Sequence, residues 1–107
     1  MNTFQEYQQT ATGLSPSLRN NRDRINLPVL GLQQESGMVG SLFESASASG
    51  KLEFTKEQAA DIKDRLADML WFIAILSNEA QIPMQSLAEH SLAQLQARAA
   101  GRNPDQR

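Results

Sequence analysis

One long uninterrupted segment constrains the fold of this chain more than any other feature. No Gly or Pro occurs between Gly50 and Pro83, and residues 55–58 (Thr-Lys-Glu-Gln) have the spacing of a capping box. We therefore predict one helix over Lys56–Glu79. Its residues 69–76 are apolar on all sides and so need burial all round. A chain of 107 residues has too few helices to surround them, which favours a homo-oligomer.

Shorter helices are predicted on both sides of this long one. Residues 3–6 (Thr-Phe-Gln-Glu) form a second candidate capping box, followed by a helix over about residues 3–11. Residues 13–26 combine Gly, Pro, Ser, Asn and three arginines and are predicted to form a loop. A helix that begins near Pro83 carries Leu at near-helical spacing and ends close to Gly101.

The segment from about Leu27 is predicted to be the second helix, because Pro28 is tolerated in a first turn and apolar residues follow at helical spacing. Three glycines interrupt this helix: Gly31, Gly37 and Gly40. Each costs up to about 1 kcal/mol relative to Ala, so their presence indicates close approach by another helix or a ligand. The alternating Ser and Ala of residues 45–50 then predict a flexible connection.

These elements predict one all-α domain over residues 1–100 with a polar tail over residues 101–107. The expected architecture is a bundle of four to five helices, completed as a homodimer or homotetramer. No internal repeat and no strand pattern occurs in the sequence.

Composition and charge exclude several classes of function. A net charge of −2 gives no basic field for a phosphate backbone, so nucleic acid is not the expected ligand. The absence of cysteine excludes disulfides, thiolate zinc sites and a cysteine nucleophile, and suits a cytoplasmic protein. The longest apolar run is far shorter than the roughly 18 residues of a membrane span, so we expect no membrane segment.

Carboxylates gather on one side of the long predicted helix. Four of them fall within a narrow sector at 3.6 residues per turn: Glu57, Asp61, Asp64 and Asp68. Stacked like charges repel, and a divalent cation with oxygen ligands, Mg²⁺ or Mn²⁺, relieves that repulsion. The alternative is a solvated face. Asp68 opens directly into the apolar run, where a charge needs a partner or a metal.

Three further residues carry open alternatives. Glu35 lies in the glycine-bearing helix without an obvious helical partner. Its carboxylate is either a ligand or one half of a structural salt bridge. Trp71 fits a core position or a platform for base stacking. His90 has no second His at ligand spacing, which favours a solvated or hydrogen-bonded role over a zinc site.

The order of these residues resembles the MazG-like superfamily of all-α nucleoside triphosphate pyrophosphohydrolases. Residues 31–39 (GLQQESGMV), 64–72 (DRLADMLWF) and 88–95 (AEHSLAQL) carry the resemblance, and residues 4–8 (FQEYQ) are similar to the usual opening helix. The similarity covers nearly the whole chain. It implies a helical bundle and an Mg²⁺-dependent hydrolysis of a nucleoside triphosphate to a monophosphate and pyrophosphate.

The resemblance also implies a set of site residues. The family pattern places ExxE on one helix and ExxD on the next, four carboxylates that hold Mg²⁺. Glu35 matches the first Glu and Asp68 the final Asp, whereas Met38 and Arg65 stand where the other two carboxylates are expected. The Asn and Lys usual on the last helix, which contact the nucleotide phosphates, are here Ser91 and Gln94.

Two interpretations of this incomplete motif remain open. In the first, Asp64 or Asp61 completes the metal shell or orients water, Glu35 and Asp68 hold the metal, and Trp71 lines a base pocket. In the second, the positive charge of Arg65 replaces the metal and pairs with Glu35 or Asp68. The first implies an enzyme, and the second a non-catalytic nucleotide-binding or assembly module with the same fold.

Overall fold

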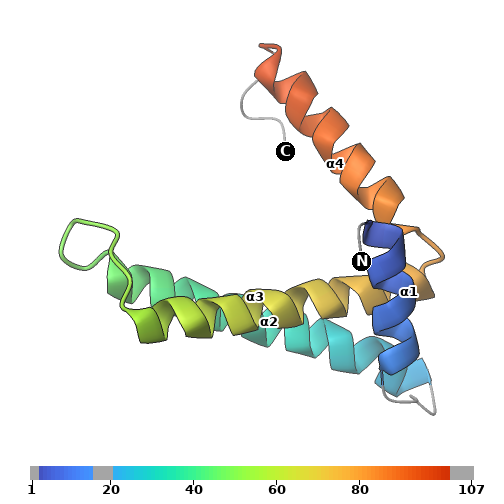
Figure 1. Ribbon diagram of the computed structural model, residues 1–107, viewed down its shortest axis with the longest axis horizontal. Coiled ribbons are helices and arrows are strands. Elements are labelled where there is room, and N and C mark those ends of the chain that lie inside the picture. The colour runs from blue at the N-terminus through green and yellow to red at the C-terminus, as the bar shows by residue number, and fades with distance from the viewer. Residues whose placement is uncertain (1–2, 16–20, 102–107) are drawn as a thin grey trace.

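The computed structural model describes residues 3–15 and 21–101, which form four helices and no strand (Figure 1). These are α1 (Phe4–Leu14), α2 (Asn21–Ala46), α3 (Lys56–Glu79) and α4 (Met84–Ala99). The predicted all-α fold is therefore confirmed within the described ranges. None of these helices combines the length and the hydropathy that a membrane crossing requires.

Helices α2 and α3 lie side by side and hold most of the core (Figure 1). Ile62 and Phe72 on α3 are buried, and Pro28 on α2 is fully buried. Gly31 makes this packing close, because a Cβ added there would lie 2.6 Å from two ring carbons of Phe72. The prediction of close helix approach is confirmed at Gly31. At Gly37 and Gly40 close approach by another helix was wrongly predicted, because no described atom outside the helix's own local backbone would lie within 4 Å of a Cβ added there.

The bounds of α3 are those predicted from its caps. The hydroxyl of Thr55 accepts from the Gln58 amide at 3.0 Å, and the Gln58 side chain accepts from the Thr55 amide at 2.9 Å. Both halves of the capping box are thus present. At the other predicted box, the Thr3 hydroxyl accepts from the amide of Glu6 at 3.0 Å and begins α1.

The predicted start of the second helix was wrong. Helix α2 begins at Asn21 rather than near Leu27, and Pro28 lies inside it. A proline within a helix leaves the carbonyl four residues earlier, here that of Arg24, without its helical hydrogen bond. Burial of the Pro28 ring favours this position despite that loss. The predicted loop is correspondingly shorter, since α1 extends to Leu14.

The turn between α3 and α4 is fixed by a side chain from α1. Gln8 is buried, and its amide nitrogen donates to the carbonyl of Ile82 at 3.1 Å. Its amide oxygen accepts from the backbone nitrogen of Met84 at 2.9 Å. Pro83 supplies no side-chain cap to α4, so Gln8 satisfies one of the free amides at the start of that helix. Gln81 takes a positive φ of 61° in the same turn.

Beyond this junction α4 extends away from α2 and α3 (Figure 1). The radius of gyration is 16.6 Å, against about 13 Å for a compact chain of this length. One chain was predicted to have too few helices to surround residues 69–76, and the single chain does leave part of this segment exposed. Leu70 is 37% exposed and Ile73 is 36% exposed, because α1 and α2 cover only part of α3.

The two glycines of α2 give a matched test of this packing. Gly31→Ala is expected to lower the free energy of unfolding by about 1–3 kcal/mol, because the new methyl group overlaps the Phe72 ring. Gly37→Ala meets open space and is expected to raise it by up to about 1 kcal/mol through helix propensity. Urea unfolding checks both. Equal effects of the two substitutions would contradict the close contact at Gly31.

Gln8→Ala is expected to lower the free energy of unfolding by about 1–3 kcal/mol, because the amide of Met84 loses its acceptor in a buried position. Gln9→Ala, at an exposed neighbouring position, is the control and should change it by less than about 0.5 kcal/mol. Thermal unfolding of the two variants measures the difference. A Gln8 variant as stable as the Gln9 control would show that α4 is held in another way.

Candidate functional site

Arg65 joins α3 to α2 at the centre of the candidate site. Its Nη1 lies 3.1 Å from Oε1 of Glu35, and its Nε lies 2.9 Å from Oδ1 of Asp61. The side chains of Arg65 and Glu35 are 23% and 14% exposed, so the pair is largely shielded from water. One guanidinium therefore holds one carboxylate on each helix.

The helical repeat explains why Arg65 reaches both carboxylates. Asp61 precedes it by one turn on α3, the i, i+4 spacing at which side chains meet on a helix surface. Glu35 follows Gly31 by one turn on α2, close to the place where the Phe72 ring of α3 packs against α2. The planar guanidinium offers separate N–H groups to two acceptors at once, which an ammonium group does with less geometric control.

This geometry bears on the two interpretations of the motif. The predicted pairing of Arg65 with Glu35 is present, whereas the alternative pairing with Asp68 is absent. Asp68 was expected to enter the core and need a partner, and this was wrong, because its side chain is exposed. It lies on the outer side of α3 with Asp64, which is also exposed. Met38 is 42% exposed and brings no ligand oxygen.

The carboxylates do not converge into a cation site. Among the described residues, no group of three or more His, Cys, Asp and Glu side chains is arranged to hold a metal ion. Glu35 and Asp61 face a positively charged group instead, and a divalent cation at the same place would be repelled by it. The arrangement neutralises charge between two helices and leaves Asp64 and Asp68 on the surface.

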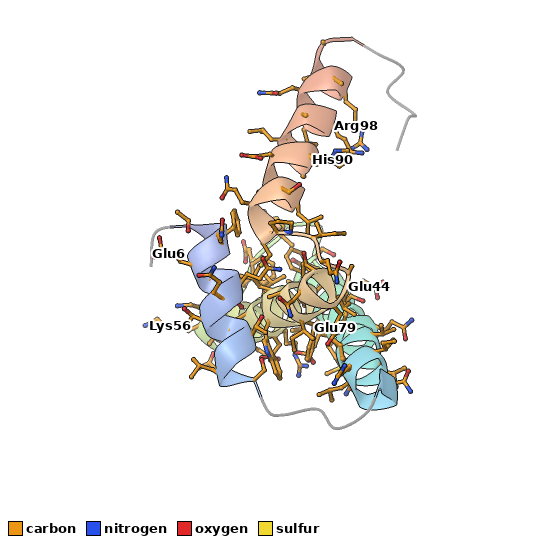
Figure 2. The ribbon with its side chains drawn as sticks, turned by 90° about the vertical axis from the view of Figure 1, so that its right-hand side faces the viewer. Glu6, Glu44, Lys56, Glu79, His90 and Arg98 are labelled. Atoms are coloured by element: carbon orange, nitrogen blue, oxygen red, sulfur yellow. The ribbon has the colours of Figure 1, made fainter. Side chains whose placement is uncertain are left out.

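The residues proposed to contact substrate lie away from this ion group. Ser91 and Gln94 are exposed on α4, which stands apart from α2 and α3. Figure 2 shows the same separation for His90 and Arg98, whose side chains extend from α4 above the other helices. Within one chain, therefore, nothing on α4 beyond its first turns approaches Arg65.

Trp71 takes a structural position at the end of α1. Its Nε1 donates to Oγ of Ser15 at 2.8 Å, and that hydroxyl donates to the carbonyl of Ala11 at 2.6 Å. The Trp71 ring also lies 4.8 Å from the Phe72 ring, centroid to centroid. A cavity of about 260 Å³ is bordered by Trp71 together with Ala11, Leu14 and Ser15. The indole thus anchors α1 to α3 and lines this shallow space.

Sequence reasoning missed two contributors to this arrangement. Asp61 was considered as part of a solvated face or as a residue for metal or water, although its spacing from Arg65 already allowed an ion pair within the helix. Gln8 was not singled out, because a neutral amide in an amphipathic helix carries no local signal of the distant backbone that it binds.

The chain matches no protein-family model, no curated protein and no solved structure.

Arg65→Ala is expected to lower the free energy of unfolding by about 1–3 kcal/mol, because it leaves the shielded carboxylate of Glu35 without its cation. Lys63→Ala, at an exposed position on the same helix, is the control and should change it by less than about 0.5 kcal/mol. Urea unfolding at low and high salt measures both. An Arg65 variant no less stable than the control would contradict a structural role for this ion group.

Proposed function

We propose that this chain is a MazG-like helical protein in which Arg65 takes the place of the catalytic metal. The observation that carries the proposal is the bridge from the Arg65 guanidinium to Glu35 and Asp61. In the family pattern Glu35 is a metal ligand and position 65 is a carboxylate. A fixed positive charge at that position supplies, without ions, the neutralisation that Mg²⁺ supplies in the family's enzymes.

The role that follows is a non-catalytic assembly module rather than a hydrolase. Pyrophosphate release depends on metal to neutralise the triphosphate and activate water, and Arg65 does not lower the pKa of a bound water as a metal ion does. On this proposal the chain keeps the helical scaffold of the family and acts through self-association. We accordingly propose a homodimer or homotetramer in the cytoplasm that binds neither nucleic acid nor membrane.

A second candidate function is the Mg²⁺- or Mn²⁺-dependent hydrolysis of a nucleoside triphosphate. The favouring observation is that Asp64 and Asp68 lie one turn apart on α3 and are both exposed. In this version Glu35, released from Arg65, and Asp68 would hold the metal, which would supply charge neutralisation and an activated water, and Asp64 or Asp61 would orient that water. Trp71 then borders the base, and Ser91 and Gln94 contact the phosphates from α4 of another subunit.

One experiment restores the two carboxylates that Met38 and Arg65 replace in the family pattern. The natural protein is expected to show no shift in melting temperature with millimolar Mg²⁺ and no pyrophosphate release from a panel of canonical and modified nucleoside triphosphates. The double variant Met38→Glu, Arg65→Glu is expected to gain several degrees with Mg²⁺, because it completes the ExxE and ExxD carboxylates of the family pattern. The double variant Met38→Gln, Arg65→Gln has the same sites without charge and should show no shift.

The natural protein decides between the functions. Pyrophosphate release with Mg²⁺ or Mn²⁺ that disappears in Glu35→Ala and in Asp68→Ala would overturn the non-catalytic proposal and establish the hydrolase. Circular dichroism of each variant confirms that a loss of release is not a loss of fold.

A further inference from the structure

A cavity of about 230 Å³ lies between α1 and the turn that joins α3 to α4. Figure 1 shows α1 beside this turn. Primary amides form most of the wall of this amide cavity, which is bordered by Gln5, Gln8, Gln9, Asn78 and Gln81. None of the described charged residues borders it. At a rise of 1.5 Å per residue, Asn78 lies about 20 Å along α3 from Arg65, so the cavity is separate from the ion group.

The helical repeat brings these amides together. Gln5, Gln8 and Gln9 are three and four residues apart on α1, so they lie on one face of that helix. Asn78 is in the last turn of α3, and its carbonyl accepts from the backbone nitrogen of Gln81 at 3.0 Å. The amide cavity therefore lies between two groups of amides, one from α1 and one from the turn.

Gln8 is the fixed member of this wall. It is 7% exposed, and its amide is oriented by hydrogen bonds to the Ile82 carbonyl and from the Met84 nitrogen. A primary amide carries two N–H donors and an oxygen with two lone pairs, so one donor and one acceptor position of Gln8 remain. Its orientation is set before any ligand arrives, which lowers the cost of binding.

The other amides of the wall have unused hydrogen-bonding capacity. Within the described part of the chain, no side-chain hydrogen bond is formed by Gln5, Gln9, Asn78 or Gln81. Gln81 also has a φ of 61°, a left-handed backbone that favours Gly. A glutamine at this position places an amide at the cavity where glycine would relieve the backbone. Such strain is typical of binding sites.

The lining favours an uncharged ligand that is rich in hydroxyl groups. Amides both donate and accept, as hydroxyl groups do. Ile82 and Pro83 add apolar surface, which suits the C–H faces of a sugar ring. An anion such as phosphate would find no cation in the wall, and a nucleobase would find no aromatic ring on which to stack.

We infer that the amide cavity binds one pyranose ring of a carbohydrate. Its volume is below the range of about 300–1,000 Å³ for sites of drug-sized ligands, so a single ring fits better than a longer oligosaccharide. The ring is either a free monosaccharide or the terminal residue of a glycan, since both offer the same hydroxyl groups. This site is independent of the function proposed for Arg65.

The position of the cavity gives binding a structural consequence. A ring that bonds to Gln9 and Gln81 joins α1 to the turn, next to the contacts of Gln8 that begin α4. A ligand that binds only the folded state raises the melting temperature. Sugar binding therefore stabilises the junction from which α4 extends.

Side-chain amide signals in ¹H–¹⁵N NMR spectra test the inference directly. The natural protein is titrated to about 100 mM with the methyl glycosides of glucose, galactose, mannose and N-acetylglucosamine. We expect at least one to give saturable shifts of the Gln9 and Gln81 amide signals, with a dissociation constant of about 1–10 mM, as suits a small open site. Shifts that never saturate, or no shifts with any of the four, would overturn the inference.

Matched variants locate the site. Gln81→Gly removes the amide and keeps the positive φ, and Gln9→Ala removes an exposed amide of α1. Each is expected to weaken binding at least about tenfold, whereas Gln34→Ala, at an exposed position on α2, should leave it unchanged. Backbone signals in the same spectra report whether each variant is folded. Equal binding by all three folded variants would overturn the site.

Two further arms fix the ligand class and its source. Saturable binding of adenosine or inorganic phosphate at these amides, without binding of a glycoside, would overturn the carbohydrate assignment. The glycoside that binds is also attached to agarose through its C1 oxygen. Retention of the natural protein, with loss of retention in Gln81→Gly, supports the terminal residue of a glycan. Saturable binding in solution without retention supports a free monosaccharide.

Discussion

A single guanidinium ties together the two helices on which the rest of the structure is built. Arg65 on α3 binds Glu35 on α2 in a place largely shielded from water, and it also binds Asp61 on its own helix, whose side chain is 43% exposed. One turn away on α2, Gly31 lets α3 approach until the Phe72 ring lies against the helix backbone. The Arg65 ion pair and the packing of Phe72 on Gly31 thus lie next to each other between α2 and α3. Loss of the cation would leave the shielded carboxylate of Glu35 without its partner.

The positions of α1 and α4 depend on this contact between α2 and α3. Trp71 hydrogen-bonds to Ser15 and holds the end of α1 against α3, and Gln8 on α1 in turn holds the first turn of α4. Helix α3 therefore positions the end of α1, and α1 positions the start of α4. The small core that results leaves a large part of α3 and most of α4 exposed.

Helix boundaries that depend on residues close in the sequence could be predicted, and features that depend on distant residues could not. Thr55 and the absence of Gly and Pro gave the bounds of α3, because caps and breakers act within a few residues. The start of α2 was misjudged, since Pro28 inside a helix is tolerated only where tertiary burial offsets its lost hydrogen bond. The direction of α4 could not be predicted from the sequence, because it depends on Gln8, which is distant in the sequence.

The candidate site likewise had residues that could be predicted from the sequence and residues that could not. The pairing of Arg65 with Glu35 was foreseen as one of two alternatives, because opposite charges on adjacent helices attract. Asp68 was misjudged, since an apolar run that follows a charge does not show which side of the helix is covered. Only the packing of α2 against α3 decides that Arg65 faces inward and Asp68 outward.

A double-mutant cycle on Glu35 and Arg65 tests the central claim most directly. Unfolding free energies of the natural protein, Glu35→Ala, Arg65→Ala and the double variant isolate the energy of this pair from the other effects of each substitution. Replacement of the metal by Arg65 predicts a favourable coupling of about 1–3 kcal/mol, unchanged by Mg²⁺. A coupling near zero, or one that appears only with the metal, would contradict it.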